Sequence, residues 1–368
     1  MKASELPPET GKSCFQAVSS CDVSTARCPG TLARGVPLSL TDPDTDPAPG
    51  SPRIVAFGGG TGMSSLLVGL REQPVEVTAV VSVSDDGGSS GRLRKDFDIA
   101  PPGDIRNCLL ALSGQEPLWA RLLDYRFQES ELAGHSIGNL LITALTRITG
   151  DFDLAIRELN RLLRVRGRVL PANGGKLTLI GTHTDGTKST GEGRIATSGK
   201  PIVSIEARPR IDEPAEDVAE AIEQAQLIVF GPGSLFTSVI PPLLIEGIRR
   251  RVLESQAPKV YIANIMTQPG ETDDMELIDH LDALERHSAE NLIDQVIAHD
   301  GTFPEDLLAS YSIQGSVPVR YEGGLEQRGV KVSVADLLDR NASSARHHSE
   351  LLGMMISEFA LSMLGKPV

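Results

Sequence analysis

A run of glycines between residues 58 and 62 has the composition of a phosphate-binding loop. The segment Gly58-Gly59-Gly60-Thr61-Gly62 follows the apolar run 53–57 and precedes residues 63–70, whose apolar side chains recur at helical spacing. Glycines let the backbone approach a ligand closely, and a helix start presents unpaired N–H groups to an anion. The sequence therefore predicts a strand, a turn and a helix that bind phosphate together. A tight turn without a ligand is the alternative.

A second polar loop follows the apolar run 75–83 and carries the adjacent carboxylates Asp85 and Asp86. Paired carboxylates beside a diphosphate suit Mg²⁺, which favours carboxylates together with substrate phosphates. We therefore take both aspartates as candidate ligand contacts and as candidate Mg²⁺ ligands, although the sequence requires no cofactor. Other candidate ligand contacts in this loop are Ser89, Ser90 and Arg92.

Two more polar turns precede apolar helical segments, at residues 101–107 and 134–139. Asp104 stands where the N-cap of a helix over 105–112 is expected, and Asn107 follows it. His135 is either a general acid or base or a structural histidine, and Asn139 binds a ribose, a phosphate or the backbone. A local positive cluster favours an anion site over a solvated basic face. It consists of Arg92, Arg94, Lys95 and Arg106.

Polar loops also follow the apolar runs 227–230 and 259–265. Ligands of open α/β sheets bind at the carboxyl ends of the strands, so this recurrence indicates a cleft for a nucleotide or a phosphorylated ligand. A dinucleotide fingerprint is only partly matched, because Met63 occupies the position of its last glycine. A nicotinamide oxidoreductase is therefore a weak alternative. The candidate contacts in these loops are Gly231, Gly233, Ser234 and Asn264.

Composition limits the classes of partner. The 368 residues carry a formal net charge of −14, and aromatic residues make up only 4% of them. Bulk binding to nucleic acid or to an anionic membrane requires a basic face, so neither is expected. No stretch approaches the roughly 18 apolar residues of a membrane-spanning helix. The first residues also lack the apolar core of a secretory signal, so we expect a cytoplasmic protein with reduced thiols.

The chain divides into a tail and one large domain. Residues 1–50 are rich in proline and poor in large apolar side chains, so we expect a disordered tail. Its cysteines, Cys14, Cys21 and Cys28, lack the spacing of a zinc site, and free thiols are favoured over a metal or disulfide role. We expect residues 51–368 to form one nucleotide-binding domain.

Short β runs separated by hairpin-type turns predict an antiparallel β insertion at about residues 168–210. The runs include 169–171, 176–180, 191–195 and 201–205. His183 and Asp185 are expected on its loops, without evident partners. Helices are predicted over 119–127, 134–145, 151–165, 213–224, 241–253, 304–310 and 344–364, and strands over 292–298 and 330–334.

Six motifs, in this order, closely resemble those of the YvcK-type gluconeogenesis factors, which are related to the CofD enzyme 2-phospho-L-lactate transferase. They lie at residues 57–62, 84–94, 101–107, 134–141, 231–238 and 266–274, and the resemblance runs from about Arg53 to the end of the chain. It implies a Rossmann-like, doubly wound α/β fold with a mostly parallel sheet. It also implies a UDP-sugar ligand such as UDP-N-acetylglucosamine, and roles in carbon metabolism, cell-wall synthesis and cell shape during gluconeogenic growth.

The resemblance extends to single residues near the C-terminus. Tyr311 and Arg346 match a tyrosine and an arginine implicated in nucleotide-sugar binding, and Ser349 stands at a phosphorylated threonine of the family. The serine keeps the hydroxyl, so it is a candidate regulatory phosphorylation site. Expected partners are cell-wall synthesis proteins and a second copy of the chain. The transferase branch leaves a Mg²⁺-dependent phosphotransferase as the alternative function, with no catalytic residue assigned.

Overall fold

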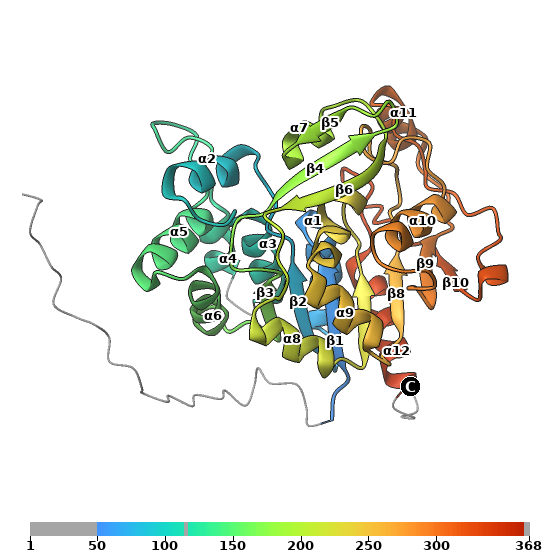
Figure 1. The fold of residues 1–368 in the computed structure, drawn as a ribbon, viewed down its shortest axis with the longest axis horizontal. Coiled ribbons are helices and arrows are strands. Elements are labelled where there is room, and N and C mark those ends of the chain that lie inside the picture. Colours follow the sequence, from blue (N-terminus) through green and yellow to red (C-terminus); the bar gives the residue numbers. More distant parts are fainter. Residues whose placement is uncertain (1–49, 114–116, 364–368) are drawn as a thin grey trace, which may run out of the picture. The chain divides into compact units, whose positions relative to one another are not determined.

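The computed structural model describes residues 50–113 and 117–363 (Figure 1). Seven parallel strands form one sheet in the order β10-β9-β8-β7-β1-β2-β3. A separate antiparallel sheet has the order β5-β4-β6. The predicted α/β class, with a mostly parallel sheet and a small antiparallel insertion, is confirmed. The predicted tail and its three cysteines lie outside the described residues, apart from Gly50.

The strands of the large sheet are β1 (Arg53–Gly58), β2 (Glu76–Val81), β3 (Arg168–Pro171), β7 (Leu227–Phe230), β8 (Lys259–Ile262), β9 (Gln295–His299) and β10 (Lys331–Ala335). The small sheet contains β4 (Thr178–His183), β5 (Lys188–Thr190) and β6 (Ile202–Arg208). The α-helices are α1 (Gly60–Arg71), α2 (Gly88–Phe97), α3 (Gly103–Leu112), α4 (Pro117–Asp124), α5 (Ile137–Thr149), α6 (Phe152–Leu162), α7 (Glu192–Ala196), α8 (Glu216–Glu223), α9 (Glu246–Glu254), α10 (Leu277–His287), α11 (Glu305–Ile313) and α12 (Ser349–Met363).

Apolar side chains on both faces of the large sheet explain its position in the core. Ile54 and Ala56 of β1 pack on one face against α1, α3 and α12. Val55 and Phe57 pack on the other face against α8, α9 and α10, together with Leu179 and Ile205 of the small sheet. Strands buried on both faces are typical of parallel sheets with helices on each side. None of the described helices is long and apolar enough to cross a membrane.

The antiparallel insertion differs from the prediction in two respects. The run 169–171 belongs to β3, which pairs in parallel with β2 at the edge of the large sheet. The predicted strand 191–195 is instead the short helix α7, which follows Gly191 at a φ of +95°. That left-handed backbone conformation ends β5 and turns the chain. In Figure 1 the three antiparallel strands and α7 lie together at the top of the view.

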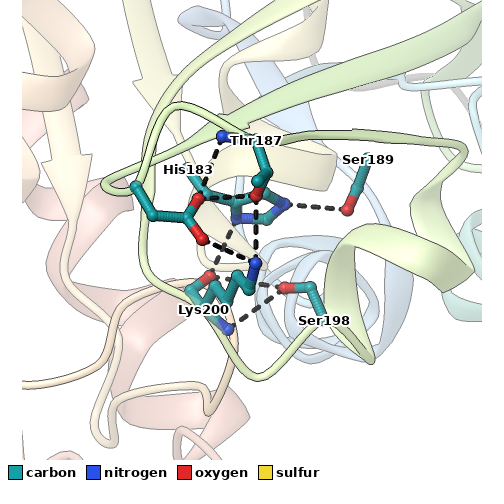
Figure 2. Close-up of polar contacts among 6 residues, drawn as sticks. His183, Thr187, Ser189, Ser198 and Lys200 are labelled. Carbon is teal, nitrogen blue, oxygen red and sulfur yellow. Dashed lines mark hydrogen bonds and ion pairs between the residues drawn. The ribbon is translucent and has the colours of Figure 1, made fainter.

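The expectation that His183 and Asp185 have no partners is wrong. His183 is buried in β4, and its ring nitrogens contact Ser189 Oγ at 2.8 Å and the Lys200 carbonyl at 3.0 Å. Asp185 accepts hydrogen bonds from Thr187 and from Lys200 Nζ, the latter at 2.6 Å. Figure 2 shows these contacts within the β4–β5 turn and the segment that precedes β6. The cluster closes the hairpin and belongs to the architecture of the insertion.

Three helical segments depart from the sequence predictions. Residues 88–97 form α2 where a loop is expected. The sequence does not predict this helix because its first residues are glycines and serines of low helix propensity. In the fold, burial of Leu93 holds the helix in place. The amphipathic α10 is not among the predicted helices, although Leu277, Leu281 and Leu284 have helical spacing. The predicted helix over 241–253 is broken at Ile245 into a 3₁₀ turn and α9.

Candidate functional site

A cavity of about 400 Å³ opens where the carboxyl ends of β1, β7 and β8 meet. From β1, the chain builds the sheet through β2 to β3 on one side and through β7 to β10 on the other. The cavity therefore lies at the point where the strand order reverses, which is the usual ligand site of open α/β sheets. The lining residues are Gly59, Gly60, Thr61, Gly62, Ser65, Asp104, Glu192, Pro232, Gly233, Ser234, Ser238, Asn264, Ile265, Met266, Thr267, Gln268, Tyr311, Ser344, Ala345, Arg346 and His347.

The first wall of the cavity is the loop between β1 and α1. Helix α1 starts at Gly60. Its N-cap residue, Gly59, has no side chain that could accept a hydrogen bond from the first N–H groups of the helix. A Cβ atom on Gly62 would lie 2.7 Å from the carbonyl oxygen of Pro232. Only glycine fits there, so the loops after β1 and β7 touch through their backbones. The arrangement leaves a helix start facing the cavity, as the sequence predicts.

Acidic side chains occupy one side of the cavity. Asp104 accepts a hydrogen bond from the Gly60 N–H, and burial together with the nearby Asp85 carboxylate raises the pKa of Asp104 to about 7. Burial, followed by Asp104 and Asp85, raises the pKa of Glu192 well above its usual range. Asp104 lies in the first turn of α3 rather than at its N-cap, which is Pro102. The N-cap expectation for Asp104 is therefore wrong, and its carboxyl group instead approaches the start of α1.

The loop after β7 supplies Gly233 and Ser234, and continues into the π-helical turn Leu235–Val239. Ser234 donates a hydrogen bond to Glu271, and Thr237 Oγ1 donates to Ser234 Oγ at 2.7 Å. Burial is the largest influence on Glu271 and raises its pKa, although the neighbouring Ser234 and Thr237 hydroxyls act to lower it. These bonds join the loop after β7 to the loop after β8 at the edge of the cavity.

The opposite wall comes from the C-terminal part of the chain. Tyr311 of α11 accepts a hydrogen bond through its hydroxyl from the Ala345 N–H, at 2.9 Å. His347 contacts the Ala263 carbonyl through Nε2 at 3.0 Å. Burial lowers the pKa of His347 to about 4, so the ring is neutral near pH 7 and its Nε2–H donates. Among the described residues that line the cavity, Arg346 is the one arginine or lysine.

The cavity brings together ten of the predicted ligand contacts, from six separate parts of the chain. These are Gly59, Gly60, Thr61, Gly62, Asp104, Gly233, Ser234, Asn264, Tyr311 and Arg346. The other ten predicted contacts do not line it. These are Gly58, Asp85, Asp86, Ser89, Ser90, Arg92, Asn107, His135, Asn139 and Gly231.

Three of the residues outside the cavity form a buried cluster of their own. Ser89 Oγ lies 2.9 Å from His135 Nδ1 and accepts a hydrogen bond from Asn139 Nδ2 at 3.1 Å. The cluster joins the start of α2 to the start of α5. Arg92 donates to the Ala133 carbonyl at 2.6 Å, which holds the loop before α5. Ser89 thus connects the side chains of His135 and Asn139, and none of the three lines the cavity.

The predicted metal pair has backbone partners. Asp85 Oδ1 accepts the Gly87 N–H and Asp86 Oδ1 accepts the Gly193 N–H, each at 2.8 Å. Within the part of the chain that the structure describes, no three histidine, cysteine, aspartate or glutamate side chains are grouped to hold a metal ion. Asp86 thereby ties the loop after β2 to α7.

Several residues that line the cavity are not among the predicted ligand contacts, for different reasons. Pro232, Ser238 and residues 266–268 lie within motifs that the sequence analysis singles out, so the signal is present. Glu192 carries no such signal, because its segment is predicted as a strand. His347 follows the predicted contact Arg346 directly, but only the folded chain shows that both reach the cavity.

Comparison with known proteins identifies a family and several relatives of this chain. Residues 54–338 match the family model of CofD, described as 2-phospho-L-lactate transferase. The gluconeogenesis factor of Halalkalibacterium halodurans is 48% identical over 267 residues, which cover 72% of this chain and 83% of that protein. The gluconeogenesis factor of Bacillus subtilis is 41% identical over 307 residues, with coverages of 83% and 97%.

A solved crystal structure also shares the fold of this chain. The crystal structure of a UPF0052-family protein from Bacillus halodurans has a TM-score of 0.81 and 44% identity, and covers 83% of this chain and 99% of its own. The family match, the relatives and this structure agree with the resemblance that the motifs show. The chain therefore belongs to the CofD family, among the proteins named gluconeogenesis factors.

Proposed function

We propose that this gluconeogenesis factor binds a UDP-sugar, such as UDP-N-acetylglucosamine, in the cavity at the carboxyl ends of β1, β7 and β8. One observation carries the proposal. The glycine loop at the start of α1 and the pair Tyr311 and Arg346, predicted from distant parts of the chain, line the same cavity. Its volume of about 400 Å³ lies within the range of about 300–1,000 Å³ that is typical of small-molecule sites.

The chemistry of the walls suits an anionic nucleotide. Beyond the Gly60 N–H, which Asp104 accepts, the N–H groups of Thr61 and Gly62 in the first turn of α1 favour a pyrophosphate, and Arg346 supplies a planar group with several donors for phosphate oxygens. Tyr311 contributes an aromatic ring at the same wall. Asn264, at the end of β8, offers both a donor and an acceptor for a base or a ribose.

Isothermal titration calorimetry tests the proposal with UDP-N-acetylglucosamine, UDP-glucose and NAD as ligands. Saturable heat with a UDP-sugar, and a much weaker response to NAD, is the expected result. Arg346→Gln should weaken UDP-sugar binding at least tenfold, because it removes a charge-assisted contact of about 1.5–3 kcal/mol. Arg340→Gln is the matched control, since Arg340 pairs with Asp336 and lies outside the cavity. Absence of heat with both UDP-sugars contradicts the proposal.

A Mg²⁺-dependent phosphotransferase is the second candidate, because residues 54–338 match the transferase family model. Asp104 and Glu192 line the cavity, and Asp85 lies near both. Their three carboxylates repel one another, and a bound cation would offset this repulsion. Incubation with nucleoside-diphosphate-linked acids and Mg²⁺, followed by a search for released nucleoside monophosphate, separates the two functions. Turnover that requires Mg²⁺ supports the transferase, whereas binding without turnover supports the factor.

The cellular role that we propose follows the resemblance. It places the protein in the cytoplasm, with a regulatory function in carbon metabolism, cell-wall synthesis and cell shape during gluconeogenic growth. Ser349, the first residue of α12, remains a proposed phosphorylation site. Growth and morphology of a deletion strain on gluconeogenic carbon sources, with and without the Ser349→Ala variant, test this role.

A further inference from the structure

The hydroxyl of Ser234 is held by a buried carboxylate on a neighbouring loop. Glu271 is 4% exposed and accepts hydrogen bonds from Ser234 Oγ and from the backbone N–H of Phe236. Thr237 Oγ1 donates its one hydrogen to Ser234 Oγ, at 2.7 Å, and lies 3.5 Å from the other carboxylate oxygen of Glu271. The carboxylate thus orients a short network at the edge of the cavity.

Counting donors and lone pairs fixes what Ser234 can offer to a ligand. A serine hydroxyl has one hydrogen and two lone pairs. The hydrogen of Ser234 points to Glu271, and one lone pair receives the hydrogen of Thr237. One lone pair remains, and Ser234 lines the cavity. In this network Ser234 can therefore accept a hydrogen bond from a ligand but cannot donate one.

We propose that Glu271 is a positioning residue that holds Ser234 as an acceptor, so that this edge of the cavity selects an N–H or O–H group of the ligand and disfavours a phosphate oxygen. The inference rests on the proposed UDP-sugar site and refines it. A phosphate oxygen beside Ser234 would meet a lone pair and the nearby Glu271 carboxylate, and both repel it. The donor group belongs either to the uridine or to the sugar of the ligand.

The network connects two loops that follow different strands, and one of these loops also supplies a control residue. Ser234 and Thr237 follow β7, whereas Glu271 follows β8. Asp273, on the loop of Glu271, accepts the Gly270 N–H at 2.8 Å and does not line the cavity. Asp273 therefore shares the loop and the type of bond with Glu271 but lacks the connection to Ser234, which makes it a matched control.

A double-mutant cycle measured by calorimetry tests the inference on the full chain. Its variants are Ser234→Ala, Glu271→Gln and the combination, with Asp273→Asn as the control, and its probes are UDP and UDP-N-acetylglucosamine. Glutamine keeps the size of the side chain but leaves one acceptor oxygen for two donors, so Ser234 loses its fixed orientation. Each single change should weaken UDP-N-acetylglucosamine binding about tenfold, the order of one hydrogen bond.

The combined variant should bind no more weakly than Ser234→Ala alone, because Glu271 acts through Ser234. Equal losses for both probes would assign the donor group to the uridine, and a loss confined to the UDP-sugar would assign it to the sugar; either result supports the inference. Additive losses, unchanged affinity or tighter binding would overturn it. If the wild-type protein binds neither probe, the proposed function fails and this inference fails with it. Thermal unfolding of each variant separates a loss of affinity from a loss of folding.

Discussion

Gly62 lies where the backbones of two strand-end loops approach each other closely. A Cβ atom there would lie 2.7 Å from the Pro232 carbonyl oxygen and 3.0 Å from the Gly233 nitrogen. Both neighbours are backbone atoms, so neither can move away as a flexible side chain would. The distance between the loops after β1 and β7, and with it the width of the cavity, depends on this missing side chain.

Gly62→Ala should therefore open the cavity and destabilise the protein. Overpacking of this kind costs about 1–3 kcal/mol, and UDP-sugar affinity should fall at least tenfold. Denaturant unfolding and calorimetry measure the two effects. Gly175→Ala is the control, because a Cβ atom on Gly175 would meet only the Asn173 amide, at 3.6 Å. Equal behaviour of the two variants would show that the contact with Pro232 does not set the width of the cavity.

A buried histidine makes stability depend on pH. His280 is fully buried against the Tyr261 hydroxyl, at 2.8 Å, and burial lowers the pKa of His280 from an ordinary 6.5 to about 4. Between these two values the unfolded chain binds a proton that the folded chain does not. The free energy of unfolding therefore falls as the pH is lowered from 6.5 to 4.

Comparison of wild type with His280→Gln isolates this contribution. The stability of the wild-type protein should fall by about 3 kcal/mol more than that of the variant between pH 6.5 and 4. Groups that titrate in the same range, such as Asp153 and His347, remain in both proteins and cancel in the difference. Urea unfolding across this pH range measures it, and parallel curves would contradict the assignment.

For single residues, the sequence predicts several of the side chains that line the cavity. Gly59–Gly62, Asn264 and Arg346 were predictable from loop position or from motif resemblance, and all line the cavity. The same pattern predicts Ser89, His135 and Asn139, but the side chains of His135 and Asn139 both bond to Ser89. A polar loop at a strand end thus predicts the region of a site, whereas the direction of each side chain depends on packing that the sequence does not show.

Elements were predictable where their burial pattern was uniform. The β7 run is apolar at all four positions and begins and ends as predicted, since a strand buried on both faces requires such a run. Helix α2 has a weak pattern and low propensity, and only its contacts with the rest of the fold stabilise it. The π-helical turn after Ser234 has no sequence signal, because distant loops anchor it: its Phe236 N–H donates to Glu271, and its Thr237 carbonyl accepts from Ser84 Oγ at 3.1 Å.

The crossing of α1 and α12 links the C-terminal wall of the cavity to the core. A Cβ atom on Gly353 would overlap the backbone of Gly69, so the helices touch without side chains between them. Helix α12 starts two residues after His347. A change in this crossing should therefore reach Arg346 and His347, although neither belongs to α12.

Gly353→Ala should reduce stability by about 1–3 kcal/mol through overpacking, and UDP-sugar affinity should fall with it. Ser357→Ala on the same helix is the control. The Ser357 hydroxyl is buried and has no hydrogen-bond partner among the described residues, so its removal should be neutral or stabilising. Thermal unfolding and calorimetry distinguish the two. Full affinity in Gly353→Ala would show that the crossing and the cavity wall are independent.

At the scale of the whole molecule, the order of the strands places the site. The chain builds β2 and β3 on one side of β1, and β7 through β10 on the other (Figure 1). Loops separated by more than 150 residues in sequence, after β1 and after β7, thereby become neighbours. The small antiparallel sheet contributes Glu192 through the helix that follows β5. Local sequence patterns predict each loop, but the convergence follows from the strand order.

The central claim is that these strand ends form one site for the pyrophosphate of a sugar nucleotide. A crystal structure of the protein with UDP-N-acetylglucosamine tests it most directly. We expect pyrophosphate oxygens within hydrogen-bond distance of the Thr61 and Gly62 amides and of the Arg346 guanidinium, with a donor group of the ligand at Ser234. A ligand bound elsewhere, or with its phosphates against Ser234 and Glu271, would contradict it.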